Sequence, residues 1–530
     1  MKNPLRRILA FIFAVFFGVT VHAQNLDIIG VTLLRAVTTN LTGAGIRVAQ
    51  PEAETSTNPP TWEVNPANSL VKQPVDLFTY TSDAGSSSAY TNSLGAESGH
   101  ADSVAGNFYG LPGGVATNVA HVDNYEADYF YNSIIAAEMP VDIGDSIVNQ
   151  SFTFGSLDAT NQEIVDSDYD NYAAQYNTLF VSAANNYDNS TIVCAPGTSY
   201  NCISVGAYAN STYCNSLGPT IDNGRCKPDI TAPSTATSFS TPQVAGAAAV
   251  LMQAGLRGDG GSDTNSAADM RTIKALLLNG AIKPADWTND APSPLDYRYG
   301  AGVLNIFNSY EQLAGGKNNF ISTATVSPGD AHPPDGASGA ITNLSGWDFN
   351  TISSGTYADR INNYYFDVSN DAASAPFTAT ATLVWNRQQN EKDINNLDLF
   401  LYNCANSNLV ACSTSLVDNV EHIWLPQLPQ GRYDLQVLKN GGTNTVSDNE
   451  TYALAWEFFS MPLNIARSGT NAALTWPIYP AGFVLEFTTN LAAPAVWSTN
   501  DIPPPTVTNG QNYILLNATN ANEFFRLRRP

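Results

Sequence analysis

Short strand-like runs alternate with helical stretches over residues 43–313, and this alternation limits the fold of the first half of the chain. The clearest strand-like runs are residues 45–49, 146–152, 178–183 and 203–208. Residues 242–253 and 270–279 instead have apolar positions that recur at helical spacing. Strands that alternate with helices form a parallel sheet that helices cover on both faces. We therefore expect an α/β domain over residues 24–315.

The pattern changes after Gly315 and Gly316, and no helical stretch follows. The later strand-like runs, separated by Gly, Asn and Asp turns, are 377–385, 397–402, 422–425, 433–438 and 452–458. They predict an all-β sandwich or jelly roll over residues 316–460. A second, small β unit follows over residues 461–530, with Trp476 and Trp497 as its expected core anchors. Several domains suit a chain of 530 residues, which is too long for one core.

The first 23 residues have the pattern of a secretory signal peptide. Lys2, Arg6 and Arg7 precede an apolar run over residues 8–19, and a small residue, Ala23, stands at the expected cleavage site. The apolar run is too short for a comfortable membrane span, and no later segment has the length of one. We therefore expect the mature chain to start near Gln24 and to be secreted or held at the cell surface.

Charge excludes some classes of partner. The chain has 23 basic and 47 acidic residues, a formal net charge of −24. Such a charge repels nucleic acid and anionic membranes and favours solubility. We therefore expect the chain to bind no nucleic acid, and we expect it to be a monomer.

The six cysteines fall into three pairs that are close in sequence. In an oxidising compartment, such pairs indicate short disulfides that fix surface loops. Metal ligation by cysteine is a poor alternative, because the chain has no CxxC spacing. The expected disulfides are Cys194–Cys202, Cys214–Cys226 and Cys404–Cys412.

A serine stands just before the proline of an Ala-rich helix, in residues 236–246, which read ATSFSTPQVAG. Free backbone N–H groups at a helix start can bind a developing oxyanion. A capped core helix is the simpler explanation of the same string. In detail, however, the segment resembles the nucleophile motif of subtilisin-like serine peptidases, Gly-Thr-Ser-x-Ala-x-Pro-x-Val-Ala-Gly. The resemblance implies Ser238 as the nucleophile, although Ala236 replaces the glycine of the motif.

Residues 98–106, SGHADSVAG, resemble the histidine motif of the same family, His-Gly-Thr-His-Val-Ala-Gly. His100 takes the place of the catalytic histidine, and Ser103 takes the place of the second histidine. Imidazole near its ordinary pKa suits a general base, which a serine hydroxyl needs to become a nucleophile.

The acid that orients the histidine has two candidates. Residues 43–52, GAGIRVAQPE, resemble the family's strand that ends in the catalytic aspartate, and Glu52 takes that place. A glutamate can accept the imidazole N–H and stabilise the imidazolium, although it is one methylene longer. Asp76 is closer to His100 in sequence but follows no comparable strand.

Residues 180–186, FVSAANN, resemble the family's Val-x-Ser-Ala-Gly-Asn segment, whose asparagine amide donates to the oxyanion. The resemblance implies Asn185 in this role, with Asn186 as the alternative if the register shifts by one residue. A turn asparagine at a strand end is the simpler explanation. Residues 147–152 resemble the strand edge that pairs with an extended substrate, which implies Ser151, Phe152 and Thr153 as substrate-binding residues.

The β units add two further expectations. Residues 393–399 and 418–422 are similar to a jelly-roll domain that follows some alkaline subtilisin-like peptidases, and such domains can bind calcium. Asp393, Asp398 and Asp418 offer carboxylates for calcium, but a solvated acidic loop explains them equally well. The terminal unit is similar to small fibronectin-like modules. The resemblance implies no required cofactor and no metal in the catalytic site.

Acid, histidine, asparagine and serine follow one another in the subtilisin order, which differs from the order in chymotrypsin and the α/β-hydrolases. The chain is therefore expected to be a secreted serine endopeptidase with a subtilisin-like α/β domain and with protein or peptide substrates. Two other classes stay open. One is a pseudo-peptidase that keeps the fold for binding, and the other is a surface-adhesion protein with an incidental α/β module.

Overall fold

The computed structural model describes most of the chain. The described residues are 25–186, 192–209, 212–213, 217–355, 357–369, 376–442, 446–492, 495–500, 502–508, 510–517 and 523–528. The predicted signal peptide and Cys214 lie outside these ranges. None of the helices in the described ranges combines the length and the hydropathy that a membrane-spanning helix requires.

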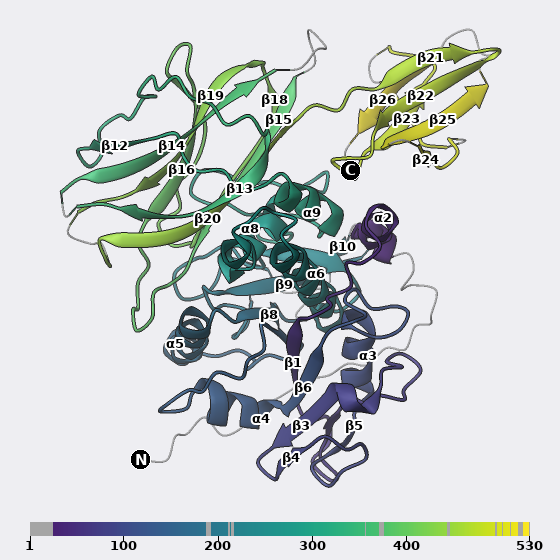
Figure 1. Cartoon of the computed structure of the whole chain (residues 1–530), viewed down its shortest axis with the longest axis vertical. Coiled ribbons are helices and arrows are strands. Elements are labelled where there is room, and N and C mark those ends of the chain that lie inside the picture. Colours follow the sequence, from purple (N-terminus) through teal and green to yellow (C-terminus); the bar gives the residue numbers. More distant parts are fainter. Residues whose placement is uncertain are drawn as a thin grey trace.

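A nine-stranded sheet forms the centre of the first domain (Figure 1). Its strands are β1 (Arg47–Glu52), β3 (Phe78–Ser82), β4 (Gly85–Ser87), β6 (His121–Glu126), β7 (Ile147–Gln150), β8 (Leu179–Ala183), β9 (Cys202–Ala209), β10 (Thr212–Tyr213) and β11 (Ile230–Pro233). Their order is β10-β9-β8-β7-β1-β6-β3-β4, with β11 also paired to β9. The pairs among β3, β6, β1, β7, β8, β9 and β11 are parallel, while β4 and β10 pair antiparallel. The predicted α/β fold class is confirmed.

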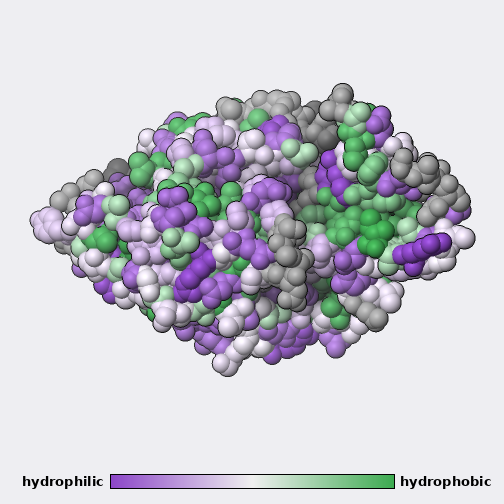
Figure 2. Space-filling model, turned by 90° about the horizontal axis from the view of Figure 1, so that it is seen from above, coloured by the Kyte–Doolittle hydropathy of each residue, from purple (hydrophilic) through white to green (hydrophobic). Residues whose placement is uncertain are grey.

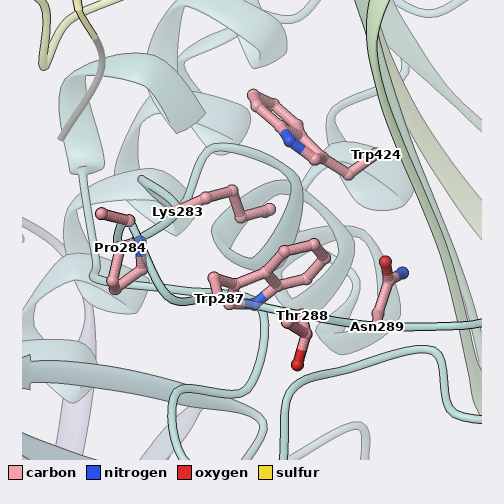
Figure 3. Close-up of a pocket in the computed structure, with 7 residues that line it drawn as sticks. Lys283, Pro284, Trp287, Thr288, Asn289 and Trp424 are labelled. Carbon is pink, nitrogen blue, oxygen red and sulfur yellow. The ribbon is translucent and has the colours of Figure 1, made fainter. Parts of the chain in front are cut away.

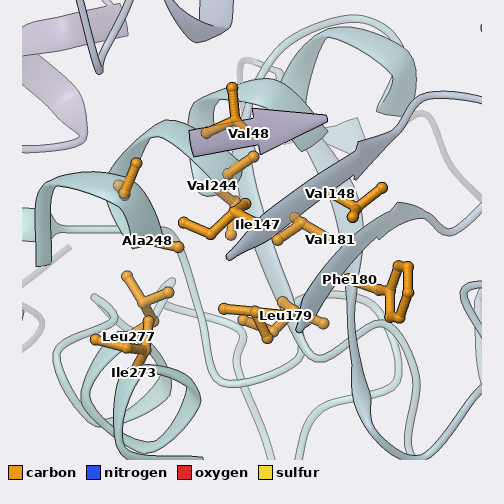
Figure 4. Packing of buried hydrophobic residues seen from close by; sticks show 14 of the residues in the cluster. Val48, Ile147, Val148, Leu179, Phe180, Val181, Val244, Ala248, Ile273 and Leu277 are labelled. Carbon is orange, nitrogen blue, oxygen red and sulfur yellow. The ribbon is translucent and has the colours of Figure 1, made fainter. Parts of the chain in front are cut away.

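Helices pack on this sheet and complete the core of the domain. The main ones are α2 (Val31–Val37), α3 (Gly99–Phe108), α5 (Ala159–Tyr176), α6 (Thr237–Arg257), α8 (Met270–Asn279) and α9 (Ile306–Ala314). Helix α6 contacts β7, β8 and β9 on one side and α8 and α9 on another. It is therefore buried on most sides, and its Val244 and Ala248 lie in one apolar cluster with Ile147 of β7 and Leu277 of α8 (Figure 4).

Two antiparallel sheets follow and form a sandwich. One contains β12 (Ser322–Val326), β14 (Asp359–Val368), β19 (Gly431–Lys439), β16 (Leu397–Asn403) and β17 (Asn408–Ser413) in that order. The other contains β13 (Ser345–Ser353), β20 (Asn449–Phe459), β15 (Phe377–Trp385) and β18 (Val420–Leu428). Apolar side chains from both sheets share one core, as inner faces of a sandwich do. The second sheet packs on the first domain through β15, β20 and α8.

A small all-β unit ends the chain. Its sheets are β21 (Asn464–Ser468), β22 (Asn471–Pro477), β25 (Gln511–Asn517) and β24 (Thr506–Thr508), and β23 (Val484–Thr488) with β26 (Phe524–Arg528). Trp476 is buried in its core, as predicted. Trp497 is half-buried beneath Arg526 and lies outside that buried cluster, so its predicted role as a core anchor is wrong. A view from above the β units shows a hydrophobic area on the side of this unit (Figure 2).

The predicted Cys404–Cys412 disulfide is wrong, because strand register separates the two residues. Both thiols are free, and Cys412 pairs with Phe400, four residues before Cys404 along the chain. Four residues of strand span about 13 Å. The Cα atoms of a disulfide lie only about 5.5 Å apart.

The predicted Cys194–Cys202 disulfide fails for the same reason. Cys202 pairs with Phe180 of β8, whereas the Cys194 backbone N–H donates to Ala184, which follows that strand. Both thiols are free and buried, and so is the thiol of Cys226, the described member of the third predicted pair.

Buried polar side chains fasten the sandwich to the first domain. Arg387, in the loop after β15, is buried and forms ion pairs with Asp170 at 3.2 Å and Glu163 at 3.1 Å, both on α5. The side chain of Asn201 donates to the Arg387 carbonyl oxygen and accepts from its backbone N–H. Because these groups are out of water, each depends on its partner in the other domain.

We expect Arg387→Met to destabilise the whole chain by about 3–5 kcal/mol, because it leaves the buried Asp170 carboxylate without its cation. Urea unfolding of the full-length protein measures this change. Arg257→Met is the matched control, since Arg257 pairs with Asp259 at the surface and is expected to contribute less than about 1 kcal/mol. Equal effects of the two substitutions would contradict a stabilising role for the interface.

Candidate active site

The predicted acid and base meet at the carboxyl edge of the parallel sheet. Glu52 is the last residue of β1, and His100 is the second residue of α3, whose start is capped by the Ser98 side chain. The His100 Nδ1 lies 2.8 Å from Glu52 Oε2, and the side chains are 9% and 1% exposed. Because an ionised carboxylate only accepts hydrogen bonds, the imidazole donates from Nδ1 and keeps the Nε2 lone pair available.

Asp76, the alternative acid, lies elsewhere. It is exposed on a 3₁₀ turn, Val75–Leu77, that leads into the amino end of β3. Strand β3 runs parallel to β6 and hence to β1, so Asp76 and Glu52 stand at opposite edges of the sheet. The structure therefore brings Glu52, and not Asp76, to His100.

A buried glutamine holds the other oxygen of the Glu52 carboxylate. Gln50 Nε2 donates to Glu52 Oε1 at 2.8 Å and to the carbonyl oxygen of Ala101 at 3.0 Å. The Tyr109 hydroxyl in turn donates to Gln50 Oε1 at 2.5 Å. Sequence reasoning missed this contact, although a glutamine two residues before the candidate acid, and so on the same face of the strand, was a signal.

The predicted nucleophile is the second residue of α6. Pro242 has no N–H, so the Ser238 carbonyl oxygen, four residues earlier, has no partner within the helix. Ser151 Oγ donates to that oxygen at 2.9 Å, and Ser238 Oγ donates back to the Ser151 carbonyl at 3.3 Å. The Ser238 hydroxyl thus contacts Ser151 and not the imidazole, although the ring of the next residue, Phe239, lies 5.8 Å from the His100 ring.

The two candidate oxyanion donors have different surroundings. Asn185, with a φ of 124°, donates from Nδ2 to Cys194 Sγ at 2.8 Å and accepts the Asn186 backbone N–H on Oδ1. Asn186 Oδ1 accepts the Thr237 backbone N–H at 2.8 Å and the Thr237 hydroxyl at 2.9 Å. The structure therefore brings Asn186 to the start of α6, beside Ser238, while the Asn185 amide is engaged with Cys194.

This geometry also fixes the orientation of the Asn186 amide. A backbone N–H can only donate, so the atom that faces Thr237 must be the oxygen Oδ1. The Nδ2 group then points away from Thr237, on an exposed side chain. Within the described residues, the backbone N–H of Ser238 has no hydrogen-bond partner, as is usual in the first turn of a helix.

The predicted substrate-binding residues follow β7 at the same edge of the sheet. Ser151 is tied to Ser238, and Thr153 Oγ1 accepts the Gly155 backbone N–H. Phe152 is buried against Ala53 and Ala127, which follow β1 and β6. The three strand ends therefore share an apolar wall beside Glu52.

Two buried acidic groups lie near this edge, and burial raises their pKa values. Glu126 pairs in register with Glu52 and accepts two N–H groups at the start of the next helix. Burial raises the pKa of Glu126 to about 7, although those N–H groups oppose the shift. Burial also raises the pKa of Asp102, two residues after His100, to about 8.

The carboxylates considered for calcium have separate surroundings. Asp418 accepts from the Cys226 backbone N–H and the Ser415 hydroxyl, and Asp398 accepts from the Asn440 amide. Within the described ranges, no group of three or more His, Cys, Asp or Glu side chains is arranged to hold a metal ion.

Distant likenesses to solved structures accompany this geometry. The prenylagaramide maturation protease PagA is 19% identical, with a TM-score of 0.35, and the match covers 54% of this chain and 99% of that one. The PatG macrocyclase in complex with peptide is 17% identical, with a TM-score of 0.37, over 55% and 98% of the chains. A protease from Pseudoalteromonas arctica is 17% identical, with a TM-score of 0.34, over 51% and 91%. No curated protein matches the chain.

A family model gives the stronger result. Residues 67–302 match the model described as Peptidase_S8, the subtilase family. The matched region contains His100, Asn186 and Ser238, and Glu52 lies before its start. Residues 67–302, which form most of the α/β domain, therefore belong to the subtilase family.

Proposed function

We propose that this chain is a secreted serine endopeptidase in which Glu52, His100 and Ser238 form the catalytic triad. The observation that supports it most is the 2.8 Å contact between Glu52 and His100, on the sheet edge where Ser238 begins α6. In this proposal His100 Nε2 takes the Ser238 proton as Oγ attacks the scissile carbonyl. Glu52 holds the Nδ1 tautomer and stabilises the imidazolium that forms.

The Ser238 hydroxyl must turn about χ1 before it can donate to His100. In this structure it donates to the Ser151 carbonyl at 3.3 Å, which is a long hydrogen bond. Catalytic hydrogen bonds are often long or poorly aligned without substrate and tighten in the complex. One weak bond is therefore a small barrier to reorientation.

The oxyanion is expected to receive two hydrogen bonds, from the Ser238 backbone N–H and from Asn186 Nδ2. Thr237 fixes the Asn186 oxygen, which preorganises the amide before the substrate arrives. A peptide in extended conformation is expected to pair with residues 151–153 as an added strand. No cofactor is needed for these steps, and calcium binding by the β sandwich stays a prediction.

A catalytically inactive binding protein is the second candidate. The Ser238–Ser151 contact favours it, because it occupies the hydroxyl that the triad requires. Adhesion through the β units alone is a third class. Fluorophosphonate labelling of the wild-type protein separates the first two classes, because only an activated serine reacts.

The triad assignment predicts a specific pattern among three variants. Ser238→Ala should abolish fluorophosphonate labelling and casein hydrolysis. Glu52→Gln should lower kcat about 10,000-fold, because an amide cannot fix the required tautomer. Asp76→Asn, the matched control, should keep wild-type activity, since Asp76 lies at the opposite edge of the sheet. Full activity of Glu52→Gln would refute the assignment.

The two asparagines predict opposite outcomes in the same assay. Asn186→Ala should lower kcat for a chromogenic peptide roughly 100- to 1,000-fold with little change in KM. Asn185→Ala should have a much smaller effect on kcat, because its amide donates to Cys194. A larger loss in Asn185→Ala would place the oxyanion donor at position 185 instead.

Gln50→Met should lower kcat by roughly tenfold or more, because a hydrogen bond to a charged group contributes about 1.5–3 kcal/mol. Gln150→Met is the matched control. Gln150 is also a buried strand glutamine that bonds a tyrosine hydroxyl, Tyr169, but it does not contact Glu52. Steady-state kinetics and melting temperatures of both variants test this, and an equal loss of kcat in both would show that Gln50 acts only through stability.

A further inference from the structure

A hollow at the junction of the first domain and the sandwich has the composition of a small-ligand site. It encloses about 460 Å³ and is lined by Lys283, Pro284, Ala285, Trp287, Thr288, Asn289 and Trp424 (Figure 3). Its volume is within the range of roughly 300–1,000 Å³ that is typical of ligand pockets, which occur preferentially between domains. No residue of the proposed triad or oxyanion site lines it.

Both indole rings of the hollow have fixed supports. Trp287 Nε1 donates to the Gly300 carbonyl at 2.7 Å, and the Trp287 backbone N–H donates to Pro284. Trp424 stands on β18 of the sandwich, and its ring lies against Phe459 of β20. In Figure 3 the two rings approach the same space from different elements, with the Lys283 side chain beside them.

Lys283 places a buried positive charge between the rings. The residue is 5% exposed, and Nζ lies 5.1 Å from the centre of the Trp287 ring and 5.3 Å from that of Trp424. Cation–π attraction holds an ammonium group in such a position. Lys283 is the one charged residue among those that line the hollow, and its Nζ also donates to the Ala281 carbonyl oxygen at 3.4 Å.

A histidine behind Trp287 adds a second polar group. His422 is fully buried, its ring packs edge-on against Trp287, and Nδ1 contacts the Thr382 hydroxyl. Its Nε2 has no hydrogen-bond partner among the described residues. Burial and the charge of Lys283 hold the pKa of His422 well below its usual range, so the ring is neutral.

The third unit of the chain also reaches this region. Gly482, with a φ of 94°, lies so close to Ile282 that an added Cβ would be 2.5 Å from Cδ1 of that isoleucine. Phe483 packs edge-on against Phe459. The hollow therefore lies where the α/β domain, the sandwich and the loop between β22 and β23 of the last β unit meet.

We propose that this hollow binds a pyranose unit of a polysaccharide. A pyranose ring has apolar C–H faces and a polar rim of hydroxyl groups. The two indoles and the Pro284 ring offer apolar surfaces for the faces. Lys283 and the Asn289 side-chain oxygen offer polar groups for the rim, since Asn289 Nδ2 already donates to the carbonyl oxygens of Pro294 and His422. An amphipathic lining of this kind matches a sugar better than a purely apolar ligand.

Calorimetric titration of the full-length protein tests the proposal with two kinds of probe. Neutral oligosaccharides (cello-, laminari- and chito-oligosaccharides) form one arm, and oligogalacturonate, which adds carboxylates that Lys283 can bind, forms the other. Saturable binding in either arm supports a pyranose site and shows which source supplies it. We expect Trp424→Ala to weaken that binding roughly tenfold and Lys283→Met to weaken it as well.

Trp497→Ala is the matched control, because Trp497 also lies beside a cation, Arg526, at 4.2 Å but in the last β unit. It should leave sugar binding unchanged. Trp424→Tyr keeps an aromatic ring and gives a second measurement if Trp424→Ala fails to fold. Absence of binding in both arms would overturn the proposal, and so would binding that Trp424→Tyr, Lys283→Met and Trp497→Ala affect equally.

Discussion

The parallel direction of β1, β6, β7 and β8 is the constraint on which the candidate site depends. Parallel strands bring all their carboxyl ends to one edge, and that edge is where open α/β sheets bind their ligands. Glu52 ends β1, and Ser151 follows β7. Asn186 follows β8 and holds the start of α6, where Ser238 stands. Residues that are up to 186 positions apart in sequence thus meet at one edge of the sheet.

Buried polar groups then determine how each side chain at this edge is held. The Glu52 carboxylate has one oxygen on His100 and the other on Gln50, so neither is left unpaired out of water. Pro242 leaves the Ser238 carbonyl without its helical partner, and the Ser151 hydroxyl replaces it. The same rule operates between domains, where Arg387 and Asn201 satisfy each other and the carboxylates of α5. The α/β domain and the sandwich therefore form one polar network as well as one packed body.

Through these contacts, the β sandwich helps to stabilise the α/β domain. Its second sheet covers α8, and its loops supply Arg387 to α5 and Asp418 to the backbone of Cys226. The hollow around Lys283 lies at the same interface, where Trp424 of the sandwich faces residues 283–289 of the α/β domain. The interface that stabilises the two domains therefore also forms the proposed sugar-binding hollow.

Sequence alone determined the fold class, because it depends on local patterns, and it also supplied the candidate site residues. Periodicity identified the helix Met270–Asn279 and the strand Phe377–Trp385 with the bounds that the structure has. Resemblance to the family's motifs selected Glu52, His100 and Ser238, and in the structure Glu52 and His100 are in contact. Asn185 was the preferred oxyanion donor, whereas the structure brings the alternative, Asn186, to Thr237.

Tertiary structure decided the features that local sequence patterns do not determine. Strand register placed Cys404 away from Cys412 and Cys194 away from Cys202, although each pair is close in sequence. Side-chain direction at a strand end decided between two adjacent asparagines. Gln50 and the Trp287–Trp424 hollow depend on contacts between residues far apart in the chain. Spacing along a sequence specifies which residue types are available, and only the packed backbone fixes the distances between their atoms.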